Sequence, residues 1–375
     1  MYSKKKIIKY IMLVVVLLIV ALIFVFNLGD INEIGNVLIH QTNYGYIALC
    51  VLILLCYCFI MQCSLTVLIR SRCKQVGFLD SMYISGTEFF FNSITPFATG
   101  GQPFQAYALK QKNMKFSDST STLLSNFLTY QLSINLIFGA FLIGYFKRIQ
   151  GQVPNLMWMI FIGFSINFII MLGVILIGCT KTAGKAIVGI MVLFSKIKFL
   201  NKFLGSRIEK FKLYISETQQ GFKDMTKNVG PLVLSLILKI ISLLIYYSIP
   251  FFIYLAIGVK LDYSDIFYVI AMTSFALNIT CWVPTPGAVG GIELAFTSLF
   301  SSLIVGYSDN VTISAMLLWR LITYYLILAY GFIMYILFEK GNKTTASNVN
   351  EIEVKVVELN EENLVNEEDS DKISE

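Results

Sequence analysis

The sequence predicts an all-α polytopic membrane protein made of two inverted repeats, and three observations support this. Of the 375 residues, 56% are hydrophobic and only 14% are charged, whereas a soluble domain carries about a quarter charged residues. Several apolar runs reach the ~20 residues that a helix needs to cross a bilayer. Two similar strings that contain Pro and paired Gly interrupt apolar segments in the two halves of the chain.

The two strings, residues 95–103 and 285–293, read TPFATGGQP and TPGAVGGIE and match at five of nine positions. Pro and paired Gly break a helix, and an unpaired backbone amide or carbonyl in hydrocarbon costs several kcal/mol. A break at membrane depth is therefore tolerated only where protein or a water-filled cavity supplies partners. Matched breaks in two halves point to a binding site near the midplane, between internal repeats.

The first half begins with two predicted spans. Three lysines precede the apolar run 7–26, a fourth, Lys9, lies at its start, and no small-residue cleavage site follows it, so we expect an uncleaved span rather than a signal peptide. The positive-inside rule places the N-terminus in the cytoplasm. The loop 27–44 has no Lys or Arg, which suits the outside, and the second span, 46–69, returns to Arg70 and Arg72.

The next apolar segment, residues 78–109, contains the first string and has basic residues on both flanks. A full crossing would place one basic cluster outside, so we expect a re-entrant hairpin that opens to the cytoplasm. The third span, 123–146, then leads out, and the fourth, 156–179, returns. The first repeat covers about residues 7–150.

The second half repeats this order from the other side, over about residues 155–340. After the fourth span, a fifth span at residues 232–257 leads out. A second hairpin at residues 265–305 opens to the outside, and a sixth span at residues 311–338 returns to the inside. About six full spans and two hairpins, counted as eight by hydropathy, therefore form a membrane domain over residues 1–340.

Two charged segments accompany this domain. The linker 181–229 mixes Lys and Arg with Phe and Leu, which is typical of a helix lying in the inner membrane interface. A solvated cytoplasmic linker is the alternative. The tail, residues 341–375, is mostly acidic and is predicted to be disordered and cytoplasmic.

Each break can form a binding surface. A half-helix that begins at membrane depth offers backbone N–H groups and the positive end of its dipole, which favour an anion such as a lipid phosphate. Close helix packing through small residues is the alternative. The substrate-binding candidates from the two strings are Thr95, Pro96, Gly100, Gly101, Gln102, Thr285, Pro286, Gly290 and Gly291.

Charged residues inside apolar segments are expensive and are functional candidates by default. Arg320 lies about nine residues into the sixth span, near ~14 Å of depth, and its guanidinium suits bidentate phosphate recognition. Its alternative role is an ion pair with Glu293 or Glu88, and Glu293 can also cap its half-helix. We expect Lys239 to snorkel to the cytoplasmic surface. The candidates added here are Glu293 and Arg320, with Glu88, Asn92, Lys239 and Asn278 as possible secondary residues.

The sequence predicts no metal, cofactor or catalytic residue. With one histidine, His40, zinc sites and catalytic triads built on His are excluded. The seven cysteines lie mostly in apolar runs and are expected to be small buried hydrophobes. The expected partner is a membrane phospholipid, without direct contact to nucleic acid.

Three features resemble the membrane domain of bacterial lysylphosphatidylglycerol synthases/flippases over roughly residues 1–340. They are TPFATGGQP at 95–103, PTPGAVGGIE at 284–293, and Arg320 with Tyr324 and Tyr325. The resemblance implies that the domain moves aminoacylated phosphatidylglycerol to the outer leaflet of the bacterial cell membrane, where it repels cationic antimicrobial peptides. In full-length members a separate cytoplasmic domain makes this lipid from charged tRNA.

After Phe338 only the short acidic tail follows, and the linker 181–229 is too short for a transferase fold. The resemblance therefore implies a stand-alone flippase-like member that lacks the C-terminal aminoacyltransferase domain and works with a separately encoded lipid-modifying enzyme. We expect a lipid-translocating or lipid-head-group-binding protein acting on an anionic or aminoacylated phospholipid. The alternatives are a phosphatidylglycerol lysyltransferase and an ion-coupled secondary transporter in which Glu88 and Glu293 carry protons.

Overall fold

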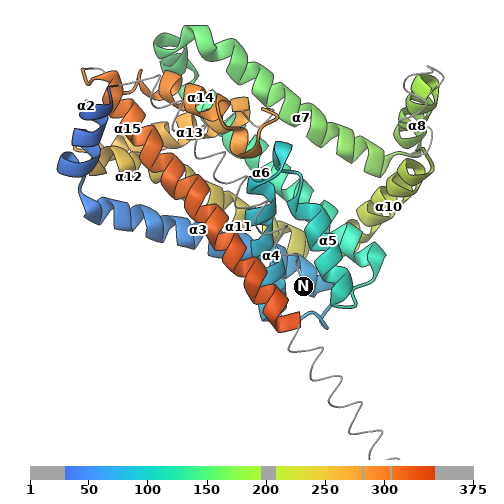
Figure 1. Ribbon diagram of the computed structural model, residues 1–375. Coiled ribbons are helices and arrows are strands. Elements are labelled where there is room, and N and C mark those ends of the chain that lie inside the picture. The colour runs from blue at the N-terminus through green and yellow to red at the C-terminus, as the bar shows by residue number, and fades with distance from the viewer. Residues whose placement is uncertain (1–29, 196–207, 281–282, 305, 343–375) are drawn as a thin grey trace, which may run out of the picture.

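The computed structural model describes residues 30–195, 208–280, 283–304 and 306–342, and these residues form helices and turns without a strand. Five helical segments among them are long and apolar enough to cross a membrane (Figure 1): Tyr44–Arg72, Phe116–Gln152, Pro154–Gly178, Gly230–Ala256 and Asp309–Asn342. They correspond to the second through sixth predicted spans, so the prediction of an all-α polytopic membrane protein is confirmed. The first predicted span, 7–26, and the acidic tail lie outside the described residues.

Helix α3 (Tyr44–Arg72) and helix α11 (Gly230–Tyr247) pack side by side at the centre of the molecule (Figure 1). Ser64 and Ser235 meet at this interface, with their hydroxyl oxygens 2.8 Å apart. Small hydroxyl residues allow two membrane helices to approach closely and to bond across the interface. Helix α12 (Ile249–Ala256) continues the fifth span after an interruption at Ser248 and also packs on α3.

Helix α6 (Phe116–Gln152) and helix α7 (Met157–Cys179) form the third and fourth spans and are joined by the turn Pro154–Leu156. The described part of the linker that follows α7 contains the helices α8 (Lys181–Ser195) and α10 (Ile208–Lys227). Helix α10 packs against α6 and α7. It is amphipathic, since Ile215 is buried while Lys223 is exposed; its location at a membrane surface stays a prediction.

Both predicted breaks are present. In the first hairpin, the turn Pro96–Ala98 separates α4 (Phe78–Ser93) from α5 (Gly101–Gln111). In the second, the turn Pro286–Ala288 separates α13 (Ile266–Thr280) from α14 (Gly291–Phe300). The strings therefore interrupt helices in the way that their Pro and Gly content predicts.

At one end of the molecule lie the loops predicted to be outside, beside α2 (Ile31–Asn36). Three contacts join these loops: Glu33 with Ser308, the amide of Lys260 with the hydroxyl of Tyr307, and Arg148 with Asp265. The second hairpin opens to this end, because α13 begins directly after Asp265.

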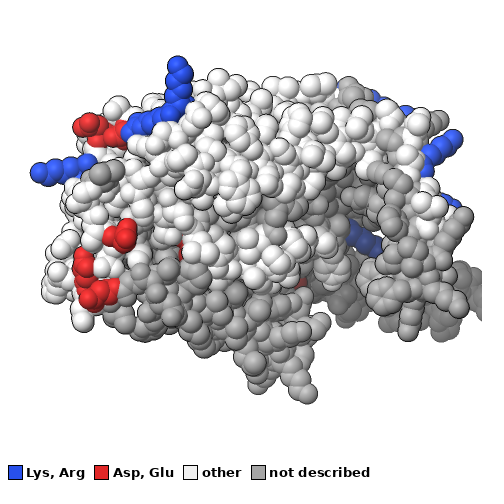
Figure 2. All heavy atoms as spheres, turned by 90° about the horizontal axis from the view of Figure 1, so that it is seen from above, with Lys and Arg blue, Asp and Glu red and all other residues white. Residues whose placement is uncertain are grey.

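The opposite end collects segments predicted to be cytoplasmic. Lys112 pairs with Asp80 at 2.9 Å, and Asn342 donates to Gln111 at 2.8 Å, so the first hairpin opens here. Figure 2 shows charged side chains gathered at the two ends, with a broad uncharged surface between them, as a bilayer-spanning protein requires. The inverted relation of the two repeats and the assignment of the two ends to inside and outside stay predictions.

The main apolar core holds the second hairpin against the last span. Phe296 of α14 stacks on Phe300 and on Trp319, with ring centroids 4.2 and 4.8 Å apart. Trp319 belongs to α15 (Asp309–Arg320) and is 1% exposed. Stacked aromatic pairs contribute about 0.5–1.5 kcal/mol beyond their buried area. This core fixes α14 and α15 relative to each other, and they carry Glu293 and Arg320.

Candidate functional site between the two breaks

The two breaks have similar backbone conformations from the threonine to the alanine of each string. The φ and ψ angles are 55° and 19° at Phe97, and 63° and 18° at the matching Gly287. Ala98 and Ala288 follow with φ of 51° and 52°. Left-handed conformations cost a non-glycine residue about 1–3 kcal/mol and cluster at functional sites. The match between the strings is therefore also a match of structure over these positions, whereas the following glycines differ, with φ of −80° at Gly100 and 93° at Gly290.

The two breaks also meet in space, because the turn Pro96–Ala98 packs against the turn Pro286–Ala288. Tyr324, from the last span, donates its hydroxyl to the backbone oxygen of Ser93 at the end of α4, at 3.0 Å. A Cβ atom at Gly287 would overlap the ring of Tyr324. Glycine at this position thus permits the close contact between the second break and the tyrosine that reaches the first hairpin.

Three amides at the breaks already have acceptors within the protein. The amide of Gly100 donates to the Thr95 hydroxyl at 2.9 Å, and that of Gly101 to the side-chain oxygen of Asn92 at 2.8 Å. The amide of Gly290 donates to Glu293 Oε2 at 2.7 Å. The expectation that the half-helices present free N–H groups is therefore wrong at these three positions. An anion here would depend on side chains and on the helix dipoles.

Arg320 and Glu293 form a buried ion pair. The distance from Arg320 Nε to Glu293 Oε1 is 2.9 Å, and the two side chains are 9% and 3% exposed. Arg320 also lies over the ring of Tyr324, with its Cζ atom 4.5 Å from the ring centroid. Glu293 therefore pairs with Arg320 and caps its own half-helix, so both of its alternative roles are observed together.

Two donors beside this ion pair have no partner among the described residues. Arg320 Nη2 and the hydroxyl of Tyr325 are both buried and make no hydrogen bond there. Leaving a buried donor unsatisfied costs about 1–3 kcal/mol, and more for a charged group. Such groups in a native fold call for a functional explanation. Each of these donors is of the kind that an anionic ligand accepts from.

Glu88 belongs to a second polar cluster, within the first hairpin. Its Oε2 accepts from Gln105 at 3.1 Å, and its Oε1 accepts from Asn92 at 3.4 Å. Gln105 lies on α5, whereas Glu88 and Asn92 lie on α4. The carboxylate thus ties the two arms of the hairpin together, and Arg320 is not its partner.

Lys239 is 1% exposed, so the prediction that it snorkels to the surface is wrong. Its Nζ donates to the backbone oxygen of Asn126, to Asn126 Oδ1 and to the Thr129 hydroxyl at 2.9, 2.7 and 2.6 Å. Ser235, one turn earlier on α11, lies at 3.4 Å. Among the described residues no carboxylate lies within 4.0 Å of this nitrogen. Neutral oxygens from α6 therefore hold the ammonium at membrane depth, and the Glu88 carboxylate lies near enough to interact with its charge.

The structure does not bring every candidate residue to the junction of the breaks. Asn278 lies between α13 and α7, where its side-chain oxygen accepts from Asn167 at 2.8 Å. Sequence reasoning missed Asn126 and Thr129 as the partners of Lys239. The spacing of Asn126 and Thr129 on one helical face within an apolar span was the available signal.

Nearly all of these features lie in a part of the chain that matches a known protein family. The family described as "Lysylphosphatidylglycerol synthase TM region" matches residues 11–331. The chain belongs to this family. A UPF0104 membrane protein of Archaeoglobus fulgidus is 24% identical over 289 residues, which are 74% of this chain and 84% of that protein. The family resemblance inferred from the two strings and Arg320 is thereby confirmed, and both breaks and Arg320 lie within the matched region.

Proposed function

We propose that this protein binds the phosphate of a membrane phospholipid between its two hairpins and moves that lipid between leaflets. The observation that carries the proposal is the buried guanidinium of Arg320, whose Nη2 has no partner among the described residues. A guanidinium presents five donors in a planar fork that matches phosphate oxygens. Glu293 engages one edge of this fork, and a lipid phosphate would engage the rest.

The surroundings of Arg320 favour a ligand that brings its own negative charge. Although Glu293 makes the ion pair neutral overall, the unpartnered Nη2 edge of the guanidinium offers a bound phosphate a charged hydrogen-bond donor at close range. Electrostatic attraction is stronger at low dielectric than in water. The hydroxyl of Tyr325 is a second donor for the same head group. An anionic phospholipid or its aminoacylated form, such as lysylphosphatidylglycerol, meets these requirements.

The hairpins supply a route for movement between leaflets. Each hairpin opens to a different end of the molecule, and the breaks meet where Tyr324 contacts Ser93. Left-handed residues at both breaks are suitable points for a change of backbone angles. Alternate opening of the two hairpins around Arg320 would expose the head group first to one side and then to the other.

The test is leaflet redistribution of phosphatidylglycerol or lysylphosphatidylglycerol in vesicles that contain the purified protein. We expect Arg320→Ala and Glu293→Gln to lower the initial rate by roughly 10- to 100-fold, because a hydrogen bond to a charged group contributes about 1.5–3 kcal/mol. The matched control is Arg148→Ala, which removes an arginine from an exposed ion pair with Asp265. Normal rates in both site variants would refute this assignment.

Lys239 favours a second candidate function, ion-coupled transport. A buried ammonium held by neutral oxygens, with the Glu88 carboxylate of the first hairpin near it, resembles the intramembrane groups that carry protons in transporters. We expect Lys239→Met to abolish any dependence of the transport rate on an imposed proton gradient while leaving a monodisperse protein. Lys260→Met, which removes an exposed lysine, is the control. Transport that ignores proton and sodium gradients in the unmodified protein would rule this function out.

A further inference from the structure

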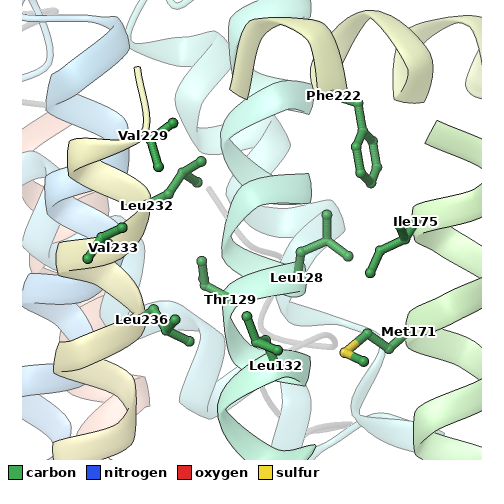
Figure 3. A pocket seen from close by; sticks show the side chains of 10 residues that line it. All are labelled: Leu128, Thr129, Leu132, Met171, Ile175, Phe222, Val229, Leu232, Val233 and Leu236. Atoms are coloured by element: carbon green, nitrogen blue, oxygen red, sulfur yellow. The ribbon is translucent and has the colours of Figure 1, made fainter. Parts of the chain in front are cut away.

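A groove lies between α6, α7, α10 and α11, away from the Arg320 site (Figure 3). Its volume is about 460 Å³, within the range of about 300–1,000 Å³ that is typical of ligand sites. Nine of the ten side chains that line it are apolar. The lining residues are Leu128, Thr129, Leu132, Met171, Ile175, Phe222, Val229, Leu232, Val233 and Leu236.

The position of the groove indicates that it faces lipid hydrocarbon. Helices α6, α7 and α11 all belong to segments long and apolar enough to span a membrane, so the groove lies at the depth of the bilayer. Lipid hydrocarbon surrounds a protein at that depth. Thr129, the one polar lining residue, is already engaged, because its hydroxyl accepts from Lys239 and donates to the backbone oxygen of Ser125 at 2.8 Å. The lining therefore suits a hydrocarbon chain and has no free group for a polar ligand.

The mouth of the groove carries positive charge. Phe222 points into it from the last turns of α10 (Figure 3), and Lys223 and Lys227 are exposed on the same turns. Arg72, at the end of α3, lies 3.4 Å from the hydroxyl of Ser125, one turn before Leu128. Two carboxylates offset part of this charge: Asp224, paired with Lys227 at 2.7 Å, and Asp118, which like Asp224 lies near Arg72. Basic residues beside a hydrocarbon site attract an anionic lipid head group.

We propose that one acyl chain of an anionic phospholipid occupies this groove, with its phosphate over the basic mouth formed by Arg72, Lys223 and Lys227. The chain would cover Thr129 and so keep water from the oxygens that hold Lys239. This lipid is a bound component of the fold rather than the lipid proposed to move past Arg320. The proposal does not depend on the proposed transport function.

The test uses the full-length protein in vesicles of phosphatidylglycerol that carries a photoreactive diazirine midway along one acyl chain. Mass spectrometry of peptides then locates the label. We expect labelling of the α6 and α7 lining residues, such as Leu132 and Met171, and its loss in Leu132→Trp, whose larger ring fills the groove. The matched control is Leu136→Trp, one turn further along α6 at a residue that is 48% exposed, where labelling of Met171 should persist.

A second comparison tests the head group. Labelling of Met171 should be lost or strongly reduced in vesicles of phosphatidylcholine with the same photoreactive chain, and in Lys223→Gln/Lys227→Gln in phosphatidylglycerol. Equal labelling by the two lipids would overturn the anionic part of the proposal. Unchanged labelling of Met171 in a monodisperse Leu132→Trp protein would overturn the proposal that an acyl chain occupies the groove. If Leu132→Trp does not fold, Met171→Phe is a second variant that fills the groove. For this variant the readout is labelling of Leu132.

Discussion

At the scale of single residues, the candidate site contains residues that each meet two structural requirements. Glu293 caps the amide of Gly290 and neutralises Arg320. Gly287 adopts a left-handed conformation and also leaves room for the ring of Tyr324. A substitution at such a position loses both contributions, whereas a substitution at a singly constrained position loses one.

Gly287→Ala tests this distinction. A left-handed alanine costs about 1–2 kcal/mol, and at position 287 the added methyl group must also displace Tyr324. We expect a larger fall in the thermal unfolding temperature than for Gly258→Ala. Gly258 has a φ of 83°, and no atom lies within 4 Å of the place that an added methyl group would take, so it isolates the backbone effect. Equal decreases in the unfolding temperature of the two variants would show that the close contact between Gly287 and Tyr324 does not contribute to stability.

At the scale of elements, a π-helical turn positions the candidate side chains of the last span. Residues Leu321–Leu326 form this turn directly after Arg320, and it contains Tyr324 and Tyr325. Single π-turns inside α-helices occur frequently at functional sites. Tyr324 is turned toward the first hairpin, whereas the Tyr325 hydroxyl is left without a partner among the described residues. The two neighbouring tyrosines therefore have opposite expected roles.

Tyr324→Phe should lower stability by about 1 kcal/mol, the usual contribution of one hydrogen bond, since it removes the link to Ser93. Tyr325→Phe should not lower stability, because the lost hydroxyl has no partner in the described structure. It should instead weaken phosphatidylglycerol binding. Thermal unfolding with and without added lipid measures both effects. A destabilised Tyr325→Phe protein with unchanged lipid binding would contradict the role given to this hydroxyl.

At the scale of the whole molecule, the arrangement places two sets of loops at opposite ends, with one hairpin opening to each. This grouping follows the distribution of basic residues that was used to predict it. The same distribution predicts which end faces the cytoplasm, and labelling from one side of the membrane tests that prediction.

Cysteine labelling assigns the ends. In a background whose native cysteines are replaced, a membrane-impermeant maleimide should label Asp309→Cys in intact cells, because this exposed residue belongs to the end predicted to be outside. Lys110→Cys, exposed at the other end, should react only after permeabilisation. The reverse pattern would show that the topology is opposite to the predicted one. Labelling of both sites in intact cells would show that the two ends do not lie on opposite sides of the membrane.

The sequence by itself determined the second through sixth spans and the two breaks, and it identified Arg320 and Glu293 as candidates. These features follow from hydropathy, from the backbone limits of Pro and Gly, and from the cost of charge in hydrocarbon, all of which act locally along the chain. Only the tertiary structure decided that the breaks touch, that Glu293 pairs with Arg320, and that Lys239 is enclosed by Asn126 and Thr129. These contacts join residues up to about 190 positions apart, and packing between helices, rather than local propensity, selects them.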